Sequence, residues 1–509
     1  MEVAAEIAVR LDTEDFLTPE SDAALETVLD ALERHGATAT FPLVAEKLRS
    51  WERRGRRHLV ARLARHTVGY HSDTHSVHPT ISEELAPLTF GEGQAAFAAR
   101  EAAGFAEVRA AFGPLRCWTQ PGGNWTAAAL PVMRKLGVPL EFSESWNSYL
   151  DVGSRPWHYC GMLHWSPPVR APKPFLSALP GCLAEALGMV REALEAEPGS
   201  GPPLCVVAHP TELCTTTFWD AVNFARGRRP APSEWRPAPV RPPEEVAAAA
   251  AAFDRYVGEL RAMGLRFVTA VDLAARYPDR APGAVLSPER VLALAPCALP
   301  AASWAVCGAL ALSAAEVLGV LCHALSHPAD QGWAVRYVAG PEEAPPARER
   351  LAGQVARSAV VAAAGWCARF VAERGCVPAT VPVERGRAAP ADFLAAVGRA
   401  LLEPGVECLL LEPRGVAADA HVKPPAQLHW DWPIFPEGFA PMGLWRQAKL
   451  QAWTLKPALP IAAARSGAAG WRSAPDGTDV SRRSLPQGRL DHGTTWRVAC
   501  GCATPPGDA

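Results

Sequence analysis

The sequence predicts an α/β fold for residues 1–280, a TIM-like barrel of about seven β–α units, followed by a smaller second domain that is mainly helical or α+β. Short apolar runs alternate with longer helical stretches from residue 5 to residue 277. Repeated strand-then-helix units indicate parallel strands, because each helix returns the chain to the start of the next strand. The chain also has 509 residues, and single cores stop growing at about 250–300 residues.

The predicted strands are short, apolar and bounded by polar or turn-forming residues. In chain order they are Ala5–Leu11, Ala37–Val44, Thr67–Tyr70, Leu115–Thr119, Val138–Phe142, Leu204–Ala208 and Arg266–Ala270. The helices predicted between them are Ser21–His35, Gly91–Ala111, Ala127–Leu136 and Pro243–Met263, the last with Gly264 as its stop signal. In barrels of parallel strands the chemistry lies at the carboxyl ends of the strands, so polar residues that follow these strands are the candidates for a site.

Composition shifts mark the predicted domain boundaries. After a barrel of residues 1–280, residues 281–289 are predicted as a linker because Pro278 to Gly283 is rich in turn formers. Residues 290–460 form the predicted second domain, where Ser313–Leu318 and, further along the chain, Ala389–Leu394 start similar helices. This pattern indicates a two-fold internal repeat or a chance match of Ala-rich helices. Residues 461–509 lose apolar periodicity and are predicted to be disordered.

The charge balance and the apolar runs exclude several classes of partner. Lys and Arg total 50 against 53 Asp and Glu, a net charge of −3 that gives no field for holding nucleic acid or an anionic membrane. Residues 1–10 lack the basic start, apolar core and cleavage site of a secretory signal. The uncharged run at residues 291–315 is interrupted by Pro296 and Pro300, which argues against a membrane span. We therefore expect a cytoplasmic protein, with its oligomeric state left open.

Three carboxylates follow the first predicted strand. Asp12, Glu14 and Asp15 lie within four consecutive residues, where they repel one another unless a cation neutralises them or water solvates them. A second group, His71 and His75, follows the third predicted strand, and two imidazoles four residues apart point the same way on a helical turn, as metal-binding pairs do. Together the two groups predict a metal site, whereas each alone could be a solvated turn.

Five segments follow one another in order along about residues 5–275: Asp12-Thr13-Glu14-Asp15, His35-Gly36-Ala37-Thr38-Ala39-Thr40-Phe41, His71-Ser72-Asp73-Thr74-His75, Thr119-Gln120-Pro121-Gly122-Gly123 and Val206-Val207-Ala208-His209-Pro210. Together they resemble the motifs of the polysaccharide deacetylase family, also called the NodB-homology or carbohydrate esterase family 4 fold. The resemblance implies a distorted (β/α)7 barrel and a hydrolase that acts on carbon–nitrogen bonds other than peptide bonds.

The resemblance also implies roles for individual residues. Asp12 is the implied general base and His209 the implied general acid, and His71 and His75 are metal ligands together with Glu14 or Asp15. The implied cofactor is one divalent ion, most often Zn, with Co, Ni or Mn as alternatives. The expected substrate groove and oxyanion donors are Pro121, Gly122, Gly123, Asn124 and Trp125. A carboxylate beside His209 is also expected, because it would stabilise the charged imidazole, and Glu141 and Glu144 are the candidates.

Two departures from the family pattern affect the expected substrate. Thr119 stands where the family has an Arg, and Gly122 stands where an aromatic residue often follows the Pro. The expected activity is removal of an N-acyl group, such as acetyl, from an amino sugar or glycan. The alternatives are hydrolysis of a small amide or ureide, as in the allantoinase-like branch of the family, and an inactive pseudoenzyme that binds carbohydrate.

Overall fold

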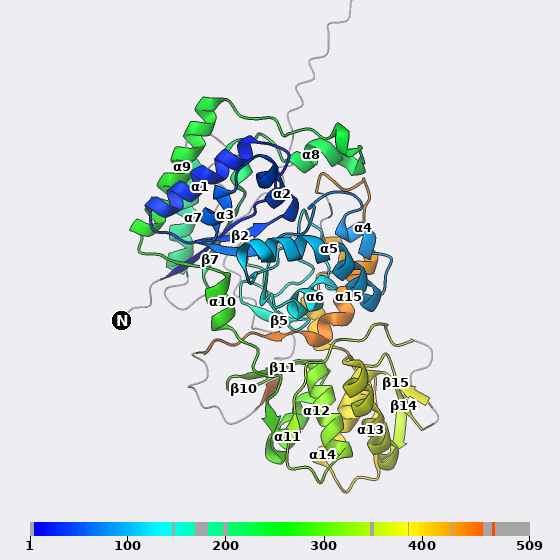
Figure 1. The fold of residues 1–509 in the computed structure, drawn as a ribbon. Helices are drawn as coiled ribbons and strands as arrows, with labels where there is room; N and C mark the ends of the chain where they lie inside the picture. The colour runs from blue at the N-terminus through cyan, green and yellow to red at the C-terminus, as the bar shows by residue number, and fades with distance from the viewer. Residues whose placement is uncertain are drawn as a thin grey trace, which may run out of the picture. The chain divides into compact units, whose positions relative to one another are not determined.

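The computed structural model describes residues 5–144, 148–167, 182–196, 202–346, 351–384, 386–428, 430, 432–461 and 471–473 (Figure 1). The predicted tail at residues 461–509 therefore lies almost entirely outside the described residues. Within the described part of the chain, no helix combines the length and the apolar character needed to cross a bilayer.

A parallel sheet lies at the centre of the N-terminal part. Its strands are β1 (Glu6–Leu11), β2 (Thr40–Leu43), β3 (Thr67–Tyr70), β7 (Leu204–Ala208) and β8 (Arg266–Val268), in the order β3-β2-β1-β7, with β8 also paired to β1. All of these pairs are parallel, and β1 runs beside β7 from Ile7↔Leu204 to Leu11↔Ala208. The predicted α/β class with a parallel sheet is thus confirmed, while closure of the sheet into a barrel stays a prediction.

The sheet continues beyond β3 through single bridges. Trp118 makes parallel bridges to Tyr70 and to Glu141, which links β3 to β4 (Leu140–Phe142). Next comes β6 (Met162–Trp165), parallel to β4, then β5 (Trp157–Tyr159) and β17 (Lys456–Pro457), both added antiparallel. The last of these strands comes from far along the chain, so a remote segment extends the sheet.

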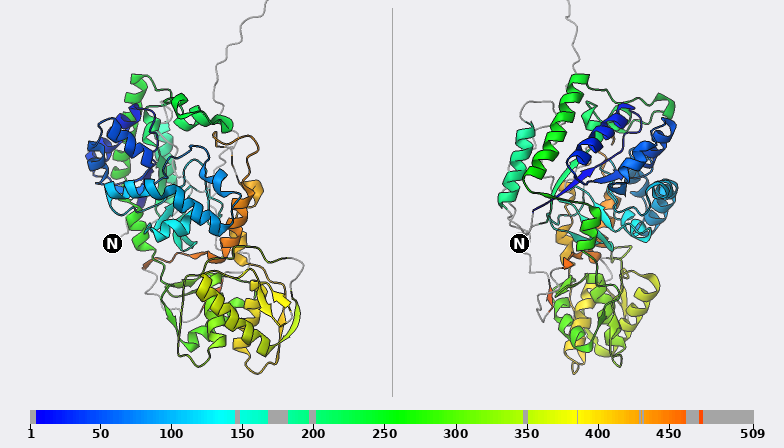
Figure 2. Two further views of the ribbon diagram at one scale, coloured as in Figure 1. Left: turned by 45° about the vertical axis from the view of Figure 1, so that its right-hand side comes forward. Right: turned by 60° about the vertical axis from the view of Figure 1, so that its left-hand side comes forward.

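Helices flank this sheet, and most begin within three residues of a strand or turn. They are α1 (Glu20–Arg34), α2 (Ala45–Arg53), α3 (His58–Leu63), α4 (Ile81–Leu85), α5 (Phe90–Phe112), α6 (Ala129–Lys135), α7 (Cys182–Ala196), α8 (Trp219–Phe224), α9 (Pro243–Ala262) and α10 (Ala270–Arg276). Thr89 caps α5 through a capping box with Glu92, which satisfies two free backbone N–H groups. Helices α1 and α9 lie side by side (Figures 1 and 2), and the Arg261 guanidinium joins them by donating to Gly36 O at 2.6 Å.

A second hydrophobic core is built from residues after 280. Its elements are β9 (Val285–Leu286), α11 (Pro288–Leu294), β10 (Ala305–Cys307), β11 (Leu310–Leu312), α12 (Ala314–Ser326), β12 (Trp333–Ala334), β13 (Gly353–Ala356), α13 (Arg357–Arg374), β14 (Val381–Val383), β15 (Gly386–Ala388), α14 (Pro390–Leu402), β16 (Cys408–Leu411) and β18 (Arg472–Ser473). The hairpin β10–β11 followed by α12 recurs as the hairpin β14–β15 followed by α14, and every boundary is displaced by the same interval along the chain. The domain boundaries themselves stay predictions.

Residues after the second core pack into the hydrophobic core of the N-terminal part. Helix α15 (Met442–Leu450) places Leu444 and Ala448 in that core. Ile434 and Phe435 join a smaller cluster with Phe16, among others, near the end of β1. Ile434, Phe435, Leu444 and Ala448 therefore belong to the packing of the N-terminal part, a feature that apolar periodicity did not indicate.

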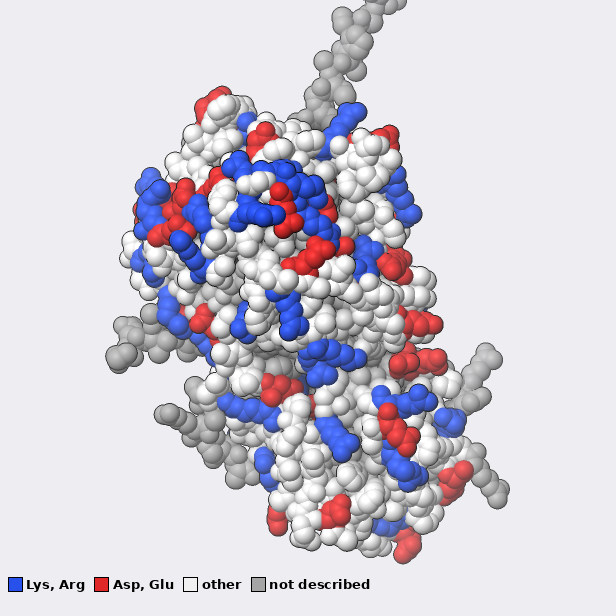
Figure 3. All heavy atoms as spheres, viewed as in Figure 1, with Lys and Arg blue, Asp and Glu red and all other residues white. Residues whose placement is uncertain are grey.

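Acidic and basic side chains are interspersed on the face shown in Figure 3. At the end of α2, Arg53 pairs with Glu46, and Arg54 pairs with Asp22. The basic side chains that gather toward the top of this face have acidic side chains beside them, and the net charge of the chain is −3.

Candidate active site

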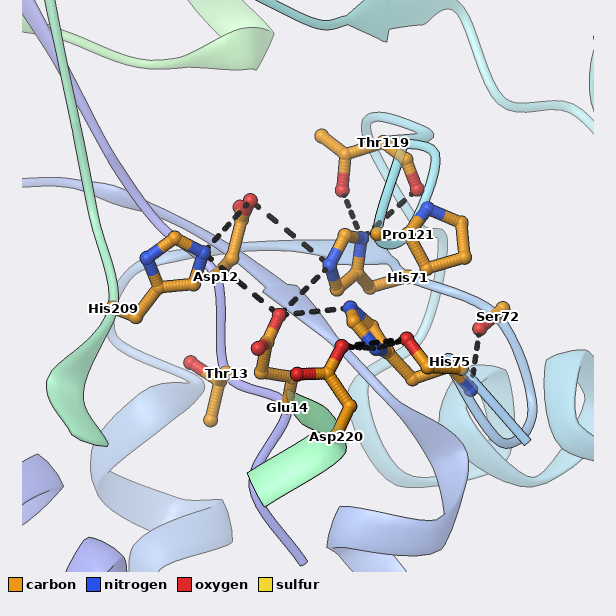
Figure 4. A network of polar contacts seen from close by, with 12 residues as sticks. Asp12, Thr13, Glu14, His71, Ser72, His75, Thr119, Pro121, His209 and Asp220 are labelled. Atoms are coloured by element: carbon orange, nitrogen blue, oxygen red, sulfur yellow. Dashed lines mark hydrogen bonds and ion pairs between the residues drawn. The ribbon is translucent and has the colours of Figure 1, made fainter. Parts of the chain in front are cut away.

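Five polar side chains converge at the carboxyl ends of three strands of the parallel sheet (Figure 4). Asp12 and Glu14 follow β1, His71 and His75 follow β3, and His209 follows β7. Since β2 lies between β1 and β3, and β7 lies on the other side of β1, the parallel order brings these ends to one edge of the sheet. The sheet thereby assembles residues that lie far apart in the sequence.

Glu14, His71 and His75 form a buried cluster. Glu14 Oε2 lies 2.9 Å from His75 Nε2 and 3.4 Å from His71 Nε2, and the three ligand atoms all lie within 4.8 Å of one another. Burial alone would raise the pKa of Glu14, but the charges of His75 and His209 and the hydrogen bonds of His71 and His75 hold it well below its usual value. Burial opposes the protonation of His75, yet the carboxylates of Glu14 and Asp220 raise its pKa.

Thr119 fixes the orientation of His71. His71 Nδ1 lies 2.9 Å from Thr119 O and 2.6 Å from Thr119 Oγ1. A carbonyl oxygen can only accept, so Nδ1 carries a hydrogen and Nε2 is the ring nitrogen that faces Glu14. The residue that replaces the family's Arg thus contacts a histidine of the cluster.

His75 is oriented by a chain of hydrogen bonds. The Ser76 hydroxyl lies 2.7 Å from His75 Nδ1 and donates to Asp220 Oδ2, also at 2.7 Å. Because the hydroxyl hydrogen is used for Asp220, Nδ1 donates to Ser76 and Nε2 is the ring nitrogen that faces Glu14. Asp220 lies on α8 and is fully buried, which raises its pKa against the opposing effects of His75, Trp432 and Ser76.

The two histidines lie on a loop rather than on the helical turn that their spacing predicted. Ser72 has a φ of 75° and His75 a φ of 56°, both in the left-handed region that non-glycine residues seldom adopt. The Ser72 hydroxyl accepts a hydrogen bond from His75 N at 2.9 Å, which holds the tight loop. The helical-turn interpretation was therefore wrong about the backbone, although the two imidazoles do face the same point.

This donor set fits a divalent ion. It offers two imidazole lone pairs and one carboxylate oxygen from buried side chains, the ligand types of catalytic zinc sites, which keep further positions open. Asp15, the other carboxylate considered as a ligand, makes different contacts. Its oxygens accept from the backbone N–H groups of Leu17 and Thr18 and from Thr211 Oγ1 at 2.9–3.0 Å.

Asp12 is held by an arginine from its own strand. Arg10 donates to Asp12 Oδ2 at 3.0 Å, to Glu144 Oε1 at 2.8 Å and to Phe142 O at 3.0 Å. Asp12 Oδ2 also lies 3.9 Å from both His71 Nε2 and His209 Nε2. Asp12 Oδ1 is buried and has no hydrogen-bond partner among the described residues, so it can accept a proton from a group that enters the site.

The carboxylate beside His209 is that of Glu212. Glu212 Oε2 lies 3.4 Å from His209 Nδ1 and accepts from the backbone N–H of His209 at 3.0 Å. The two carboxylates proposed for this place make other contacts, since Glu141 binds His164, and Glu144 binds Arg10. Glu141 is turned into the core, where its oxygen also accepts from the fully buried Trp125 indole at 2.8 Å.

The turn after Thr119 borders the cluster. A Cβ on Gly122, which has a φ of 46°, would lie 2.8 Å from Ser76 Oγ and 3.4 Å from His75 Cε1, so only glycine fits this close approach. Asn124 braces the turn by donating to Pro121 O at 3.1 Å and to Gly122 O at 3.3 Å. Gly123 also has a positive φ, of 72°. The full burial of Trp125 leaves its ring no surface for a substrate.

Four residues of the site were missed from the sequence. Arg10 is a charged residue inside an apolar strand and two positions before Asp12, and Glu212 follows a His-Pro pair at the spacing of a capping turn, so both gave a readable signal. Asp220 gave none, because its place depends on how distant segments pack. The aromatic run that includes Trp432 was interpreted as packing, with the lining of a ligand groove as the alternative.

No family model and no curated protein matches the chain. Solved structures do match, each over about half of it. A carbohydrate esterase family 4 pseudoenzyme from Bacillus anthracis is 12% identical over 53% of this chain and 66% of its own, with a TM-score of 0.30. A peptidoglycan N-acetylglucosamine deacetylase is 15% identical over 52% and 86%, with a TM-score of 0.29. A variant of a peptidoglycan deacetylase from Bacillus subtilis is 13% identical over 53% and 90%, with a TM-score of 0.27. The chain is thus similar, at low identity, to a carbohydrate esterase family 4 pseudoenzyme and to two peptidoglycan deacetylases.

Proposed function

We propose that this protein is a metal-dependent hydrolase that removes an N-acyl group, such as acetyl, from an amino sugar or glycan. The observation that carries the proposal is the buried Glu14–His71–His75 cluster with Asp12 and His209 beside it. Binding alone needs neither a base nor an acid, whereas hydrolysis of an amide needs both.

The cluster would hold one divalent ion, with Zn preferred and Co, Ni or Mn as alternatives. Such an ion polarises the acyl carbonyl and lowers the pKa of water toward about 7. Asp12 Oδ1 then accepts the proton of the attacking water as the new C–O bond forms. Arg10 holds Asp12 in place for this step, because its guanidinium is fixed at the same time by Glu144 and Phe142 O.

His209 completes the reaction as the acid. When the C–N bond breaks, His209 Nε2 donates a proton to the leaving nitrogen, and Glu212 stabilises the charged imidazole through Nδ1. His209 Nε2 and Asp12 Oδ2 are 3.9 Å apart, so acid and base can serve the same carbonyl centre. The backbone N–H of Gly122 is a candidate donor to the oxyanion, because no side chain blocks the approach to it.

The substrate class is inferred from the resemblance of the five segments. The segment that begins with Thr119 also supports a second candidate substrate. Thr119, in the place of the family's Arg, binds His71 instead of shaping a groove for a sugar chain. A small amide or ureide is therefore the second candidate, since it needs no extended groove.

The test combines metal analysis with an activity assay. The metal content of wild type is compared with that of the variant His71→Ala/His75→Ala, and acetate release from N-acetylglucosamine oligomers is measured alongside. A matched control is His323→Ala/His327→Ala. These two histidines, at the end of α12, are also four residues apart, and their ring centroids are 4.9 Å from each other. They do not belong to the Glu14–His71–His75 cluster.

We expect about one equivalent of metal in wild type and in the control, none in the cluster variant, and acetate release that follows the metal. Metal binding without acetate release would overturn the glycan substrate and leave the small amide. Wild type that binds no metal even after reconstitution would overturn the hydrolase and leave an inactive binding protein.

A further inference from the structure

We propose that Trp432, which follows His209 at a long distance in the sequence, is a positioning residue of this hydrolytic site. Its indole N–H holds Asp220, and Asp220 orients the metal ligand His75 through Ser76. The inference rests on the proposed function, since it assigns His75 to a metal. It also means that a segment outside residues 1–280 completes the site.

The contacts form one continuous chain of three short hydrogen bonds and one ion pair. Trp432 Nε1 donates to Asp220 Oδ2 at 3.0 Å, and the Ser76 hydroxyl donates to the same oxygen at 2.7 Å. Ser76 Oγ lies 2.7 Å from His75 Nδ1, and His75 Nε2 lies 2.9 Å from Glu14. Four contacts therefore join the C-terminal segment to the centre of the cluster.

The segment that follows Trp432 is anchored by backbone hydrogen bonds and by apolar burial. Pro433 O accepts from Arg226 N at 2.8 Å, and Ile434 O accepts from Gly227 N at 3.0 Å. Ile434 is fully buried and Phe435 is 5% exposed, in the same cluster as Trp219, the neighbour of Asp220. The indole is thus held at Asp220 by backbone hydrogen bonds and apolar burial on the α8 side of the site.

Trp432 also borders the parts of the site that would face the substrate. A Cβ on Gly122 would lie 3.4 Å from Trp432 Nε1, so the turn with the candidate oxyanion donor packs against the indole. On the other side the Trp432 ring lies 5.5 Å from the ring of Phe218, which in turn lies 4.9 Å from the imidazole of His209. The indole therefore lies between the metal-ligand side and the acid side.

The physical reason for a role lies in the burial of Asp220. Its side chain is fully buried, so its oxygens have lost their hydration and depend on protein donors. Without the indole N–H, Asp220 Oδ2 relies on the Ser76 hydroxyl, and Ser76 can then rotate away from His75. Partners that orient metal-ligating histidines change metal affinity or activity by about 10–100-fold when they are mutated.

The decisive variant is Trp432→Phe, which keeps an aromatic ring and removes the N–H donor. Its matched control is Trp445→Phe, because Trp445 is also half-buried in the C-terminal segment and its indole donates to a distant acceptor, Lys423 O, at 2.9 Å. The Kd for Zn²⁺ is measured on the full chain by competition with a chromophoric chelator, and kcat and KM are measured on the same preparations.

We expect Trp432→Phe to weaken Zn²⁺ binding by about tenfold or more, and Trp445→Phe to change it by less than about twofold. Asp220→Asn, which leaves the indole in place, should weaken binding at least as much, and the double variant should be no worse than the more severe single one. This non-additivity is expected only if both residues act through His75.

Two outcomes would overturn the inference. If the Kd of Trp432→Phe for Zn²⁺ lies within about twofold of that of wild type, Trp432 only packs at the site. The same follows if the losses of binding free energy in Trp432→Phe and Asp220→Asn add in the double variant. In both cases the proposed function stands. If wild type binds no Zn²⁺, the proposed function fails and the inference fails with it. Thermal unfolding with EDTA present distinguishes a folding defect from a loss of metal affinity. A folding defect would lower the unfolding midpoint of Trp432→Phe far below that of Trp445→Phe.

Discussion

The choice between Glu14 and Asp15 as the carboxylate ligand gives a sharp prediction. The perturbation is a matched pair of isosteric changes, Glu14→Gln and Asp15→Asn, at adjacent positions in the chain. Glu14 Oε2 lies 2.9 Å and 3.4 Å from the two histidine Nε2 atoms. The oxygens of Asp15 are taken by two backbone N–H groups and a hydroxyl. We therefore expect the first change to affect the metal and the second to affect the fold.

The magnitudes follow from general values. Structural zinc sites with four ligands bind with about 10–16 kcal/mol, so each ligand contributes roughly 2.5–4 kcal/mol, which is about 10²–10³-fold in Kd. Glu14→Gln should weaken Zn²⁺ binding by about this factor. Asp15→Asn keeps one acceptor oxygen but disturbs buried hydrogen bonds, at a cost of about 1–3 kcal/mol in unfolding free energy and less than about twofold in Kd.

The assay is chelator competition for the Kd, with urea unfolding in EDTA for stability. The reasoning would be refuted if Asp15→Asn lost the metal while Glu14→Gln retained it. Equal losses in both variants would also count against it, because the structure gives the two carboxylates separate tasks.

Three further outcomes are expected. Arg10→Lys keeps the charge but loses the planar fork that binds three acceptors, so kcat should fall by about 10²-fold with the Zn²⁺ Kd unchanged; an unchanged kcat would remove Arg10 from the mechanism. Burial lowers the pKa of His158 to about 4 against about 6.5 when unfolded, so its contribution to stability is complete above about pH 6.5 and is lost as the pH falls toward 4. Urea unfolding in EDTA should show that, as the pH falls from about 6.5 to about 4, the unfolding free energy of wild type decreases by up to about 3 kcal/mol more than that of His158→Gln. Removal of metal by EDTA should lower the unfolding free energy by about 2.7 kcal/mol at a free metal concentration of about 100 Kd, and should leave His71→Ala/His75→Ala unaffected in a calorimetric scan.

Strands with strong β-branched runs were predicted closely. Thr67–Tyr70 and Leu204–Ala208 have the predicted bounds, and β1 begins at Glu6, one position later than predicted. The strands β5 and β6 were missed, because Trp157–Tyr159 and Met162–Trp165 are short and rich in Trp and His. Short segments of this kind become strands by pairing with neighbours, a tertiary effect that local preference does not carry.

Residues of the site were predictable where the sheet itself places them. Asp12, Glu14, His71, His75 and His209 all follow strands, and a parallel sheet brings strand ends to one edge whatever the details of packing. The direction of a side chain was less predictable. Glu141 points into the core toward His164. Residues that arrive from helices and late segments, such as Asp220 and Trp432, require the packed structure before their place can be seen.

The long separation between Asp12 and Trp432 bears on the synthesis of the protein. Chains leave the ribosome at about 5–20 residues per second, so the roughly 400 residues between them take about 20–80 s to emerge. During that time the parallel strands can pair and the histidines can meet Glu14, but the indole that holds Asp220 has not yet been made. A nascent chain can thus carry the three cluster residues well before Trp432 is made, so full activity would appear only after Trp432 has been translated.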